Sequence, residues 1–309
     1  MKLKYRILWI ENEEDWVESI EDLIQDYLED LGFIYERTII AKEEKNINYN
    51  DFDLILMDLN LADQPNGAEL ISKIRDLGVY TDVVFYSASG IDELRAKGRE
   101  KELEGVFYSG RTPETAFINR VKAVIDATLK KVQDLNNLRG LVMAEVSELD
   151  SRMTSLIEKY FIEKGNETKT ATFKKHLVDD VEKATKRKLS ESEKCDKLCK
   201  HKWNGLKISE IVQDFEFDAS RKARAVKLII EEEKYPYKAK NKNFYEDYHI
   251  DMLSMRNQLA HCVSIIKGGK EILKTKDEDI EFDDAKFKSI REQIKAYNGL
   301  FDDIETIVQ

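Results

Sequence analysis

The 309-residue sequence contains few residues of the kinds that break or cross-link a chain: 13 glycines, three prolines and three cysteines. So little glycine and proline excludes collagenous, mucin-like and low-complexity chains. Three cysteines cannot form a disulfide framework, and an odd number is typical of a reducing compartment. We therefore expect stability to come from packed cores, for which 42% apolar residues are ample.

Long hydrophobic runs are also missing. The first apolar run is interrupted by Glu11, far short of a signal-peptide core. No later stretch reaches the roughly 18 uncharged apolar residues of a membrane-spanning helix. The sequence thus predicts a soluble, cytoplasmic protein without a membrane partner.

The charge of the chain is unevenly distributed. Residues 1–134 hold 17 Lys and Arg against 28 Asp and Glu, a net charge of −11, whereas residues 135–309 hold 33 of each kind. An acidic half favours a cation site or a basic partner, and a balanced half leaves local basic patches available to a phosphate backbone. The length also suits two domains.

Short apolar runs alternate with helical periodicity over the first 130 or so residues. Runs of buried-strand type occupy residues 5–10, 33–40, 53–57, 82–86 and 106–108. Helical spacing of apolar residues occupies 16–31, 68–77, 91–103 and the stretch after Pro113. This alternation predicts an α/β domain at residues 1–128, with a doubly wound, five-stranded parallel sheet covered on both faces.

Polar residues follow the predicted strands at their carboxyl ends, where parallel sheets bind ligands. They are Glu11, Asn12 and Glu13 after the first strand, Asp58 after the third, Ser87 after the fourth, and Ser109 and Arg111 after the fifth. Acids, hydroxyls and a cation are therefore expected to meet at one edge of the sheet.

This constellation resembles the receiver domain of two-component response regulators over about residues 4–128. The resemblance implies that Asp58 accepts a phosphoryl group from a histidine kinase or a phosphotransfer protein. It also implies a Mg²⁺ site formed by Asp58 with Glu11, Asn12 and Glu13. A carboxylate attacks phosphorus poorly unless a divalent cation neutralises the phosphoryl oxygens. Ser87 matches the hydroxyl that binds the new phosphoryl oxygen.

Three features depart from the receiver pattern. The acidic pair reads Glu11–Asn12, so one carboxylate is lost unless Glu13 replaces it. The position of the family's lysine after the fifth strand is taken by Ser109 or Arg111. The loop from Asp58 to residue 67 is one residue longer than usual. A receiver used only for docking therefore remains an alternative.

The stretch between the two halves lacks glycine and proline over residues 114–139, and its apolar residues recur every three or four positions. This pattern predicts one joint helix over about 114–140, which can carry motion between domains, or which simply packs in two local cores. The second domain, residues 129–309, is predicted to be mainly α-helical. Gly268–Gly269 predicts a small β-hairpin, with residues 279–282 as a further strand.

The helix predicted over His249–Ile266 carries three polar residues of interest. Its apolar residues make one buried stripe: Met252, Met255, Leu259, Cys262 and Ile266. At about 100° per residue, Asn257 and His261 lie on nearly the same bearing, away from that stripe, with Arg256 beside them. The three residues form either idle surface or a site that another surface completes.

The segment Arg256–His261 resembles the Arg-x4-His motif of HEPN domains, helical modules that include metal-independent ribonucleases of toxins and phage-defence proteins. From composition, a match with Asn after Arg is expected by chance about 0.01 times in this chain. The resemblance covers about residues 135–309. It implies an endoribonuclease acting on RNA in stress or phage defence, a homodimer in which two motifs share one cleft, and no cofactor at this site.

These side chains suit RNA cleavage by the RNA's own 2′-hydroxyl. The imidazole of His261 can take up and release a proton, as general acid–base catalysis requires. Arg256 offers a permanent, forked cation for phosphate, and Asn257 can orient the phosphate or the hydroxyl. Three alternatives stay open. The first is a response regulator whose non-catalytic HEPN domain binds nucleic acid or protein, the second is one that reads DNA with the helix around Arg221–Lys227, and the third is an interaction module whose output is dimerisation.

Two weaker patterns also occur in the second half. Lysines are frequent over residues 169–207, and they alternate with aromatic residues over 234–248, which suits either single-stranded RNA or a solvated surface. Cys195, Cys199 and His201 have the spacing of metal ligands but lack a fourth ligand, so zinc is not predicted.

Overall fold

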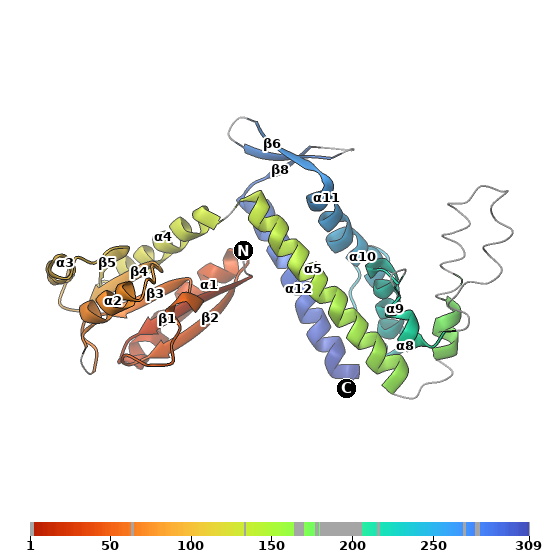
Figure 1. Cartoon of the computed structure of the whole chain (residues 1–309), viewed down its shortest axis with the longest axis horizontal. Helices are drawn as coiled ribbons and strands as arrows, with labels where there is room; N and C mark the ends of the chain where they lie inside the picture. Colours follow the sequence, from red (N-terminus) through yellow and green to blue (C-terminus); the bar gives the residue numbers. More distant parts are fainter. Residues whose placement is uncertain are drawn as a thin grey trace. The chain divides into compact units, whose positions relative to one another are not determined.

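The computed structural model describes residues 3–62, 65–132, 134–163, 170–176, 179, 206–214, 217–267, 270–275 and 279–308. The chain forms two compact units (Figure 1). Unit 1 comprises Met1–Leu141 and Asp283–Glu292, and unit 2 comprises Val142–Phe282 and Gln293–Gln309. The predictions for Cys195, Cys199, His201 and most of the lysine-rich stretch lie outside the described residues.

Unit 1 contains a five-stranded sheet in which every strand pair is parallel. The order is β2-β1-β3-β4-β5. The strands are β1 (Lys4–Ile10), β2 (Ile34–Ile40), β3 (Leu54–Asp58), β4 (Val83–Ser87) and β5 (Val106–Gly110). The α/β fold class predicted from the alternation of strands and helices is confirmed.

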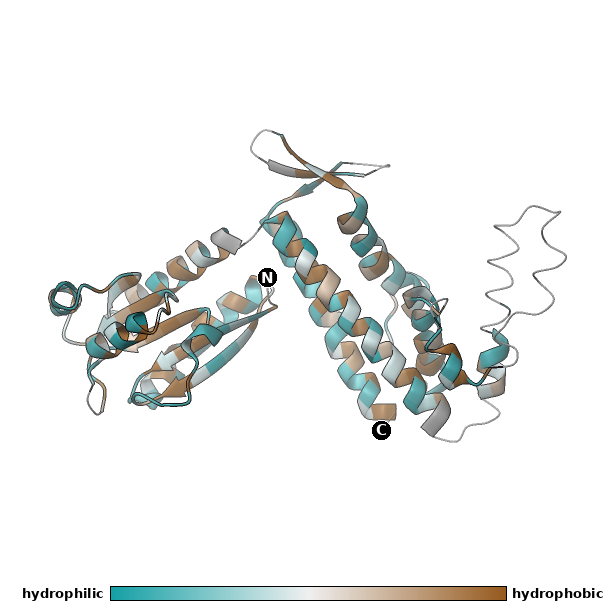
Figure 2. Ribbon diagram, in the orientation of Figure 1, coloured by the Kyte–Doolittle hydropathy of each residue, from teal (hydrophilic) through white to brown (hydrophobic). Residues whose placement is uncertain are grey.

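Helices cover both faces of this sheet because successive side chains of a buried strand point to opposite faces. In β1, Ile7 and Trp9 belong to one apolar cluster, and Leu8 and Ile10 to another. Figure 2 shows apolar central strands between helices with one apolar face each. Helices α1 (Glu14–Asp30) and α4 (Glu114–Val132) pack in the first cluster, and α2 (Gly67–Asp76) and α3 (Ile91–Glu100) in the second.

The predicted joint helix over 114–140 is wrong, because two helices occupy this stretch. Helix α4 ends at Val132, and α5 spans Leu135–Glu158. Asp134 caps α5: its Oδ1 accepts the Asn137 backbone N–H at 2.8 Å, and its carbonyl accepts that of Leu138 at 3.0 Å. An aspartate that satisfies the free N–H groups of a first turn starts a new helix rather than continuing the old one.

Unit 2 is mainly helical, as predicted. In the described part of the chain, its labelled helical segments are α5, η2 (Lys159–Glu163), α8 (Ile208–Ile211), α9 (Ala219–Glu232), α10 (Phe244–Tyr248), η5 (His249–Ser254), α11 (Met255–His261) and α12 (Asp284–Val308), with α5 and α12 also contributing residues to unit 1. Residues 170–176 are helical as well. No helix among the described residues is long and apolar enough to cross a membrane.

The helix predicted over His249–Ile266 is correct only in its first part. Its first six residues are π-helical, and α11 ends at His261 because Cys262 is extended, with φ −91° and ψ 146°. The following β-branched residues form β6 (Val263–Lys267), which pairs antiparallel with β7 (Lys270–Lys274), which in turn pairs with β8 (Asp279–Phe282). This confirms the predicted hairpin and third strand, and it places Ile266 in an exposed strand instead of a buried stripe.

Candidate functional site

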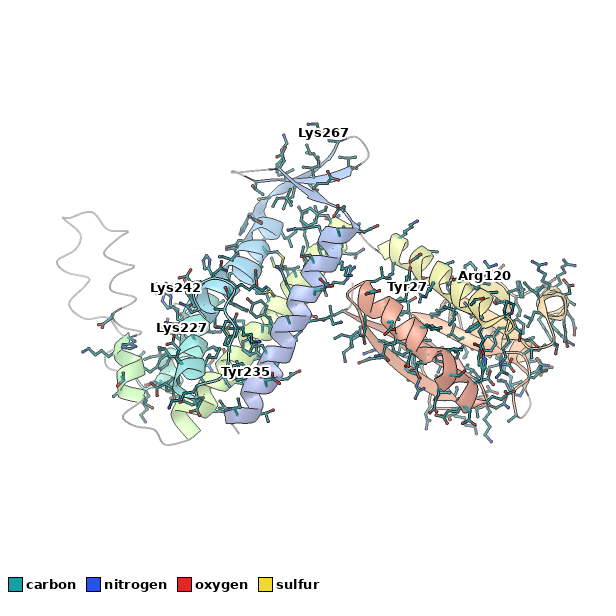
Figure 3. The ribbon with its side chains drawn as sticks, turned by 180° about the vertical axis from the view of Figure 1, so that it is seen from behind. Tyr27, Arg120, Lys227, Tyr235, Lys242 and Lys267 are labelled. Carbon is teal, nitrogen blue, oxygen red and sulfur yellow. The ribbon has the colours of Figure 1, made fainter. Side chains whose placement is uncertain are left out.

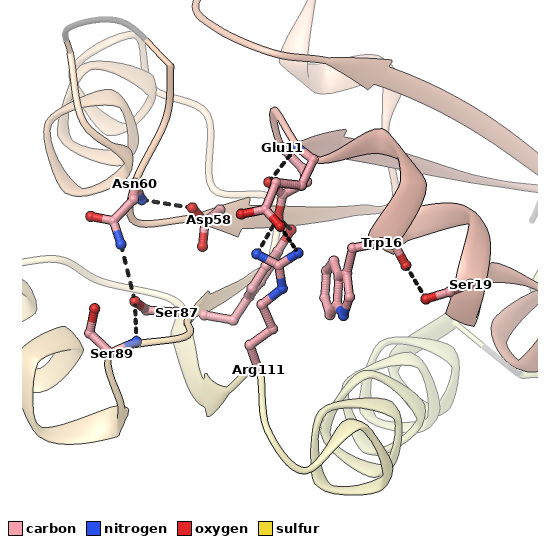
Figure 4. Close-up of polar contacts among 10 residues, drawn as sticks. Glu11, Trp16, Ser19, Asp58, Asn60, Ser87, Ser89 and Arg111 are labelled. Carbon is pink, nitrogen blue, oxygen red and sulfur yellow. Dashed lines mark hydrogen bonds and ion pairs between the residues drawn. The ribbon is translucent and has the colours of Figure 1, made fainter.

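Two carboxylates are buried at the carboxyl ends of the strands in unit 1. Asp58 is the last residue of β3, and Glu11 directly follows β1; their exposed fractions are 4% and 2%. Figure 4 shows Asp58 between Asn60 and Glu11. Because β1 and β3 are neighbours in the sheet, the fold brings these two acids together, as the sequence predicted.

Hydrogen bonds hold the Glu11 carboxylate in place. The Tyr86 hydroxyl donates to Oε2 at 3.0 Å, and the Glu13 backbone N–H donates to Oε1 at 2.9 Å. Burial, and then the charge of Glu11, raise the pKa of Tyr86 well above its ordinary value, so its hydroxyl stays protonated and remains a donor. Tyr86 therefore orients the acid that faces Asp58.

The environment of Asp58 opposes its ionisation. Burial, and secondarily the charge of Glu11, raise the pKa of Asp58 from its ordinary value of 3.8 to about 6. The Asn60 N–H, which donates to Oδ2 at 2.8 Å, and the Arg111 cation act in the opposite direction. The pKa remains raised because burial and Glu11 together outweigh these two stabilising groups.

Arg111 supplies the cation of this site. Its Nη2 donates to Glu13 Oε2 at 2.8 Å, its Nη1 lies 3.9 Å from Glu11 Oε2, and its guanidinium stacks 4.0 Å from the centre of the Trp16 ring. Ser109 is buried, and its hydroxyl donates to the neighbouring carbonyl of Gly110. Of the two residues that could take the position of the family's lysine, Arg111 is the one that contacts the acidic side chains.

Ser87, the last residue of β4, lies on the other side of Asp58. Its Oγ accepts the Ser89 backbone N–H at 3.1 Å and the Asn60 side-chain amide at 3.5 Å. Asn60 therefore contacts both Asp58 and Ser87. Asn12, by contrast, is exposed.

A glycine closes the loop that follows Asp58. The Gly67 N–H donates to the Leu59 carbonyl at 3.0 Å, and a Cβ on Gly67 would lie 2.0 Å from the Asp58 carbonyl oxygen. Any side chain here would clash with backbone, which cannot move away as a flexible side chain can. The absence of a side chain at Gly67 thus permits the loop to pass this close to the backbone of Asp58.

The donor set suits a magnesium ion bound by few protein groups. No cluster of three or more His, Cys, Asp and Glu side chains able to hold a metal occurs within the described ranges. Mg²⁺ is commonly held by one or two carboxylates, with waters and phosphate completing its octahedron. Glu11 and Asp58 provide two adjacent carboxylates, whereas Glu13 is engaged by Arg111.

In unit 2, the three residues singled out from the sequence line one cavity of about 380 Å³. The remaining lining residues come from α5, α9 and α11: Met143, Val146, Ser147, Asp150, Ala219 and Ala260. Arg256 donates through Nε and Nη2 to Asn257 Oδ1, at 3.2 and 2.8 Å. His261 is exposed rather than sealed inside the chain.

Several residues of these sites were not found from the sequence. Tyr86 and Trp16 were assigned only to a strand and a helix, although Tyr86 directly precedes Ser87. Asn60 follows Asp58 by two residues, a spacing that suits a contact with it. Asp150 and Met143 lie more than 100 residues before His261 and carry no sequence signal that connects them to the motif.

No protein-family model and no curated protein sequence matches the chain. The chain is similar to the signal receiver domain of a putative Luxo repressor protein from Vibrio parahaemolyticus, with 21% identity, 41% of this chain and 92% of that chain covered, and a TM-score of 0.31. It is also similar to the non-phosphorylated HemR receiver domain from Leptospira biflexa, with 26% identity, 40% of this chain and 94% of that chain covered, and a TM-score of 0.31. A third similar structure is a CheY-like response regulator receiver domain protein from Methanospirillum hungatei JF-1. It has 19% identity, 41% of this chain and 98% of that chain are covered, and the TM-score is 0.32.

The topology of unit 1 itself identifies its fold. A parallel sheet with the order 2-1-3-4-5 is the doubly wound arrangement of CheY and flavodoxin, which binds ligands at the carboxyl ends of its strands. Here that edge carries an aspartate at the end of the central strand, with a second buried acid and a hydroxyl on the flanking strands. Unit 1 has the fold of a response-regulator receiver domain.

Proposed function

We propose that the chain is a signal-controlled, RNA-cleaving effector. In this proposal the receiver unit accepts a phosphoryl group at Asp58 and regulates a metal-independent endoribonuclease of the HEPN type in unit 2. The receiver part is supported by the fold and by the Glu11–Asp58–Ser87 arrangement. The observation that carries the ribonuclease part is the meeting of Arg256, Asn257 and His261 in one solvent-open cavity.

The phosphoryl group comes from the phosphohistidine of a histidine kinase or phosphotransfer protein. A bond forms between an Asp58 oxygen and phosphorus while the bond from phosphorus to the histidine nitrogen breaks. Mg²⁺, held by Asp58 and Glu11, neutralises the phosphoryl oxygens when it is bound. The Ser87 hydroxyl and the Arg111 guanidinium flank Asp58 and donate to the transferred group.

In unit 2, the RNA supplies its own nucleophile. The 2′-oxygen bonds to the adjacent phosphorus, the bond to the 5′-oxygen breaks, and the products end in a 2′,3′-cyclic phosphate and a 5′-hydroxyl. His261 takes the proton from the 2′-hydroxyl, and an imidazolium returns a proton to the leaving 5′-oxygen. Arg256 stabilises the charge that develops on the phosphate oxygens, and Asn257 orients the phosphate.

A second copy of the chain completes this site in the proposal. Proton removal and proton return are assigned to two imidazoles, one from each copy of a homodimer. The exposed positions of Asn257 and His261 support such pairing.

One observation favours a second candidate function. The Arg256 guanidinium donates through Nε and Nη2 to the amide oxygen of Asn257, so part of its donor set is already used within the chain. A non-catalytic HEPN unit, controlled by the receiver and binding nucleic acid or protein, is consistent with that pairing.

A cleavage assay separates these functions. The full chain is incubated in excess EDTA with labelled RNA and with duplex DNA, beside His261→Ala and Gln258→Ala. Gln258 is an exposed residue of the same helix outside the cavity, and its variant serves as the matched control. The ribonuclease predicts RNA cleavage by the wild type and Gln258→Ala and none by His261→Ala. Binding without cleavage, before and after treatment with a phosphodonor and Mg²⁺, would reject it in favour of the second candidate.

A further inference from the structure

The segment Lys234–Asn243 of unit 2 is a basic, aromatic loop. Its ten residues, KYPYKAKNKN, include four lysines and two tyrosines but no acid. It follows α9, whose last residues are acidic, so the change of charge is abrupt. Such a composition is typical of surfaces that attract phosphate and stack bases.

A buried carboxylate holds this loop in one conformation. Asp247, with 0% exposure, accepts hydrogen bonds from the Tyr237 hydroxyl, the Lys240 N–H, and both the backbone and side-chain amides of Asn241, at 2.7 to 2.9 Å. Burial alone raises the pKa of Asp247, but these donors outweigh it and hold that pKa below its ordinary value. Asp247 therefore anchors the loop through its backbone at Lys240 and Asn241 and through the Tyr237 side chain.

Two adjoining cavities join the loop to α9. One, of about 410 Å³, is lined by Arg224, Lys227, Lys242, Asn243 and Tyr245 among others. The other, of about 340 Å³, shares Lys227, Lys242 and Asn243 and adds Lys234 with two tyrosines of the loop. Figure 3 shows Lys227 and Lys242 on neighbouring segments of this surface. Because they share three lining residues, the cavities form one groove, which we call the lysine groove.

The lysine groove begins beside the cavity of the Arg-x4-His motif. Ala219 lines that cavity, and its neighbour Ser220 lies 3.2 Å, oxygen to oxygen, from the Tyr245 hydroxyl. Ser220, Arg224 and Lys227 follow the i, i+4, i+7 spacing of one helical face. Along α9, Lys227 is about 12 Å from Ala219. The motif cavity and the groove are therefore consecutive along one helix.

The chemistry of the groove suits a single strand. The Arg224 guanidinium lies over the Tyr245 ring, 4.5 Å from its centre, and donates to its hydroxyl at 3.1 Å, which makes a cation–aromatic pair. The groove is also lined by three acidic residues, Asp179, Glu231 and Glu246. Glu231 forms an ion pair with Lys227 at 3.4 Å, so the acids partly offset the positive charge of the groove. Aromatic rings stack on unpaired bases, whose faces a duplex does not expose.

We propose that the lysine groove binds single-stranded RNA and leads it to the cavity that contains Arg256 and His261. Phosphates lie against Lys227 and Lys242, and bases stack on the tyrosines of the groove. The direction of the strand, towards the motif, rests on the proposed ribonuclease; binding by the groove does not.

Binding is measured with the full chain carrying His261→Ala, so that bound RNA stays intact. A fluorescent single-stranded RNA without secondary structure is titrated at several salt concentrations, against the same protein with Lys227→Glu and Lys242→Glu added. Lys267→Glu, an exposed lysine of β6 outside the groove, is the matched control. Lys227→Gln with Lys242→Gln tests the same contacts without charge reversal, and circular dichroism checks that each variant is folded.

Loss of two phosphate contacts predicts a Kd at least about tenfold higher and a plot of log K against log salt that is flatter by about 1.4. The control is expected to bind within about twofold of its parent. Groove variants that bind like the control, or a parent that prefers duplex DNA or an acidic protein to single-stranded RNA, would overturn the proposal. The failure of the ribonuclease proposal looks different. If the groove binds RNA in a salt-dependent manner but the protein with His261 intact cleaves no RNA, RNA binding by the groove is supported and the ribonuclease is rejected.

Discussion

Replacing Asp58 with asparagine should stabilise unit 1 in the absence of divalent cations. The folded state holds the Asp58 carboxyl at a pKa of about 6, against an ordinary value of 3.8, so ionised Asp58 opposes folding. That penalty is absent below pH 3.8, grows as pH rises between the two values and is complete above about 6. The difference corresponds to about 3 kcal/mol near pH 8 and about half of that near pH 5.

The test compares urea unfolding of the wild type and Asp58→Asn in EDTA at both pH values. Trp9 and Trp16 report on unit 1 by fluorescence. Asp22→Asn, which removes an exposed carboxylate from the middle of α1, is the control and should change the free energy of unfolding by less than about 0.5 kcal/mol. A gain that is equal at the two pH values, or a loss of stability at about pH 8, would refute the electrostatic account of this site.

Magnesium extends the same prediction. If Glu11 and Asp58 hold the ion, saturating Mg²⁺ at about 100 times its Kd should stabilise the wild type by about 2.7 kcal/mol. Asp58→Asn should gain much less, because one of the two carboxylates is gone. Equal stabilisation of both proteins would place the ion elsewhere.

The remaining predictions concern neighbours of Asp58 and the loop that carries it. Arg111→Ala should destabilise unit 1 by about 1–3 kcal/mol in EDTA, with much of the loss regained in Mg²⁺; equal losses in both buffers would contradict a shared charge balance. Tyr86→Phe should cost about 1.5–3 kcal/mol, read by urea unfolding, because Glu11 loses a hydrogen bond. Gly67→Ala should cost about 1–3 kcal/mol or more because its Cβ meets the Asp58 carbonyl; an unchanged unfolding midpoint would show that the loop can move.

The sheet of unit 1 could be predicted because each of its strands and helices leaves a pattern in a short stretch of sequence. Buried parallel strands read as short apolar runs, and the covering helices read as one-sided periodicities. The meeting of Glu11, Asp58 and Ser87 followed from the rule that parallel strands present their carboxyl ends at one edge. The choice between Ser109 and Arg111 did not follow, because it depends on which side chain turns towards the acids.

The errors arose where a capping or strand-forming signal competed with helical periodicity. Asp134 lies within a repeat of apolar residues but caps α5. The apolar periodicity by itself therefore predicted one helix where the chain forms two. Cys262 ends α11, although the apolar spacing continues to Ile266, because the following residues pair with β7. The cavity around His261 includes residues from α5 and α9, and contacts of such long sequence separation leave no local pattern.

The most direct test of the proposed chemistry uses an oligonucleotide with one ribose in an otherwise deoxy strand, incubated with the full chain in excess EDTA. The proposed ribonuclease should make a single cut on the 3′ side of that ribose, leaving a 2′,3′-cyclic phosphate and a 5′-hydroxyl, and the His261→Ala variant should make none. Cleavage of a fully deoxy strand at the same rate, or an unchanged rate with His261→Ala, would contradict it.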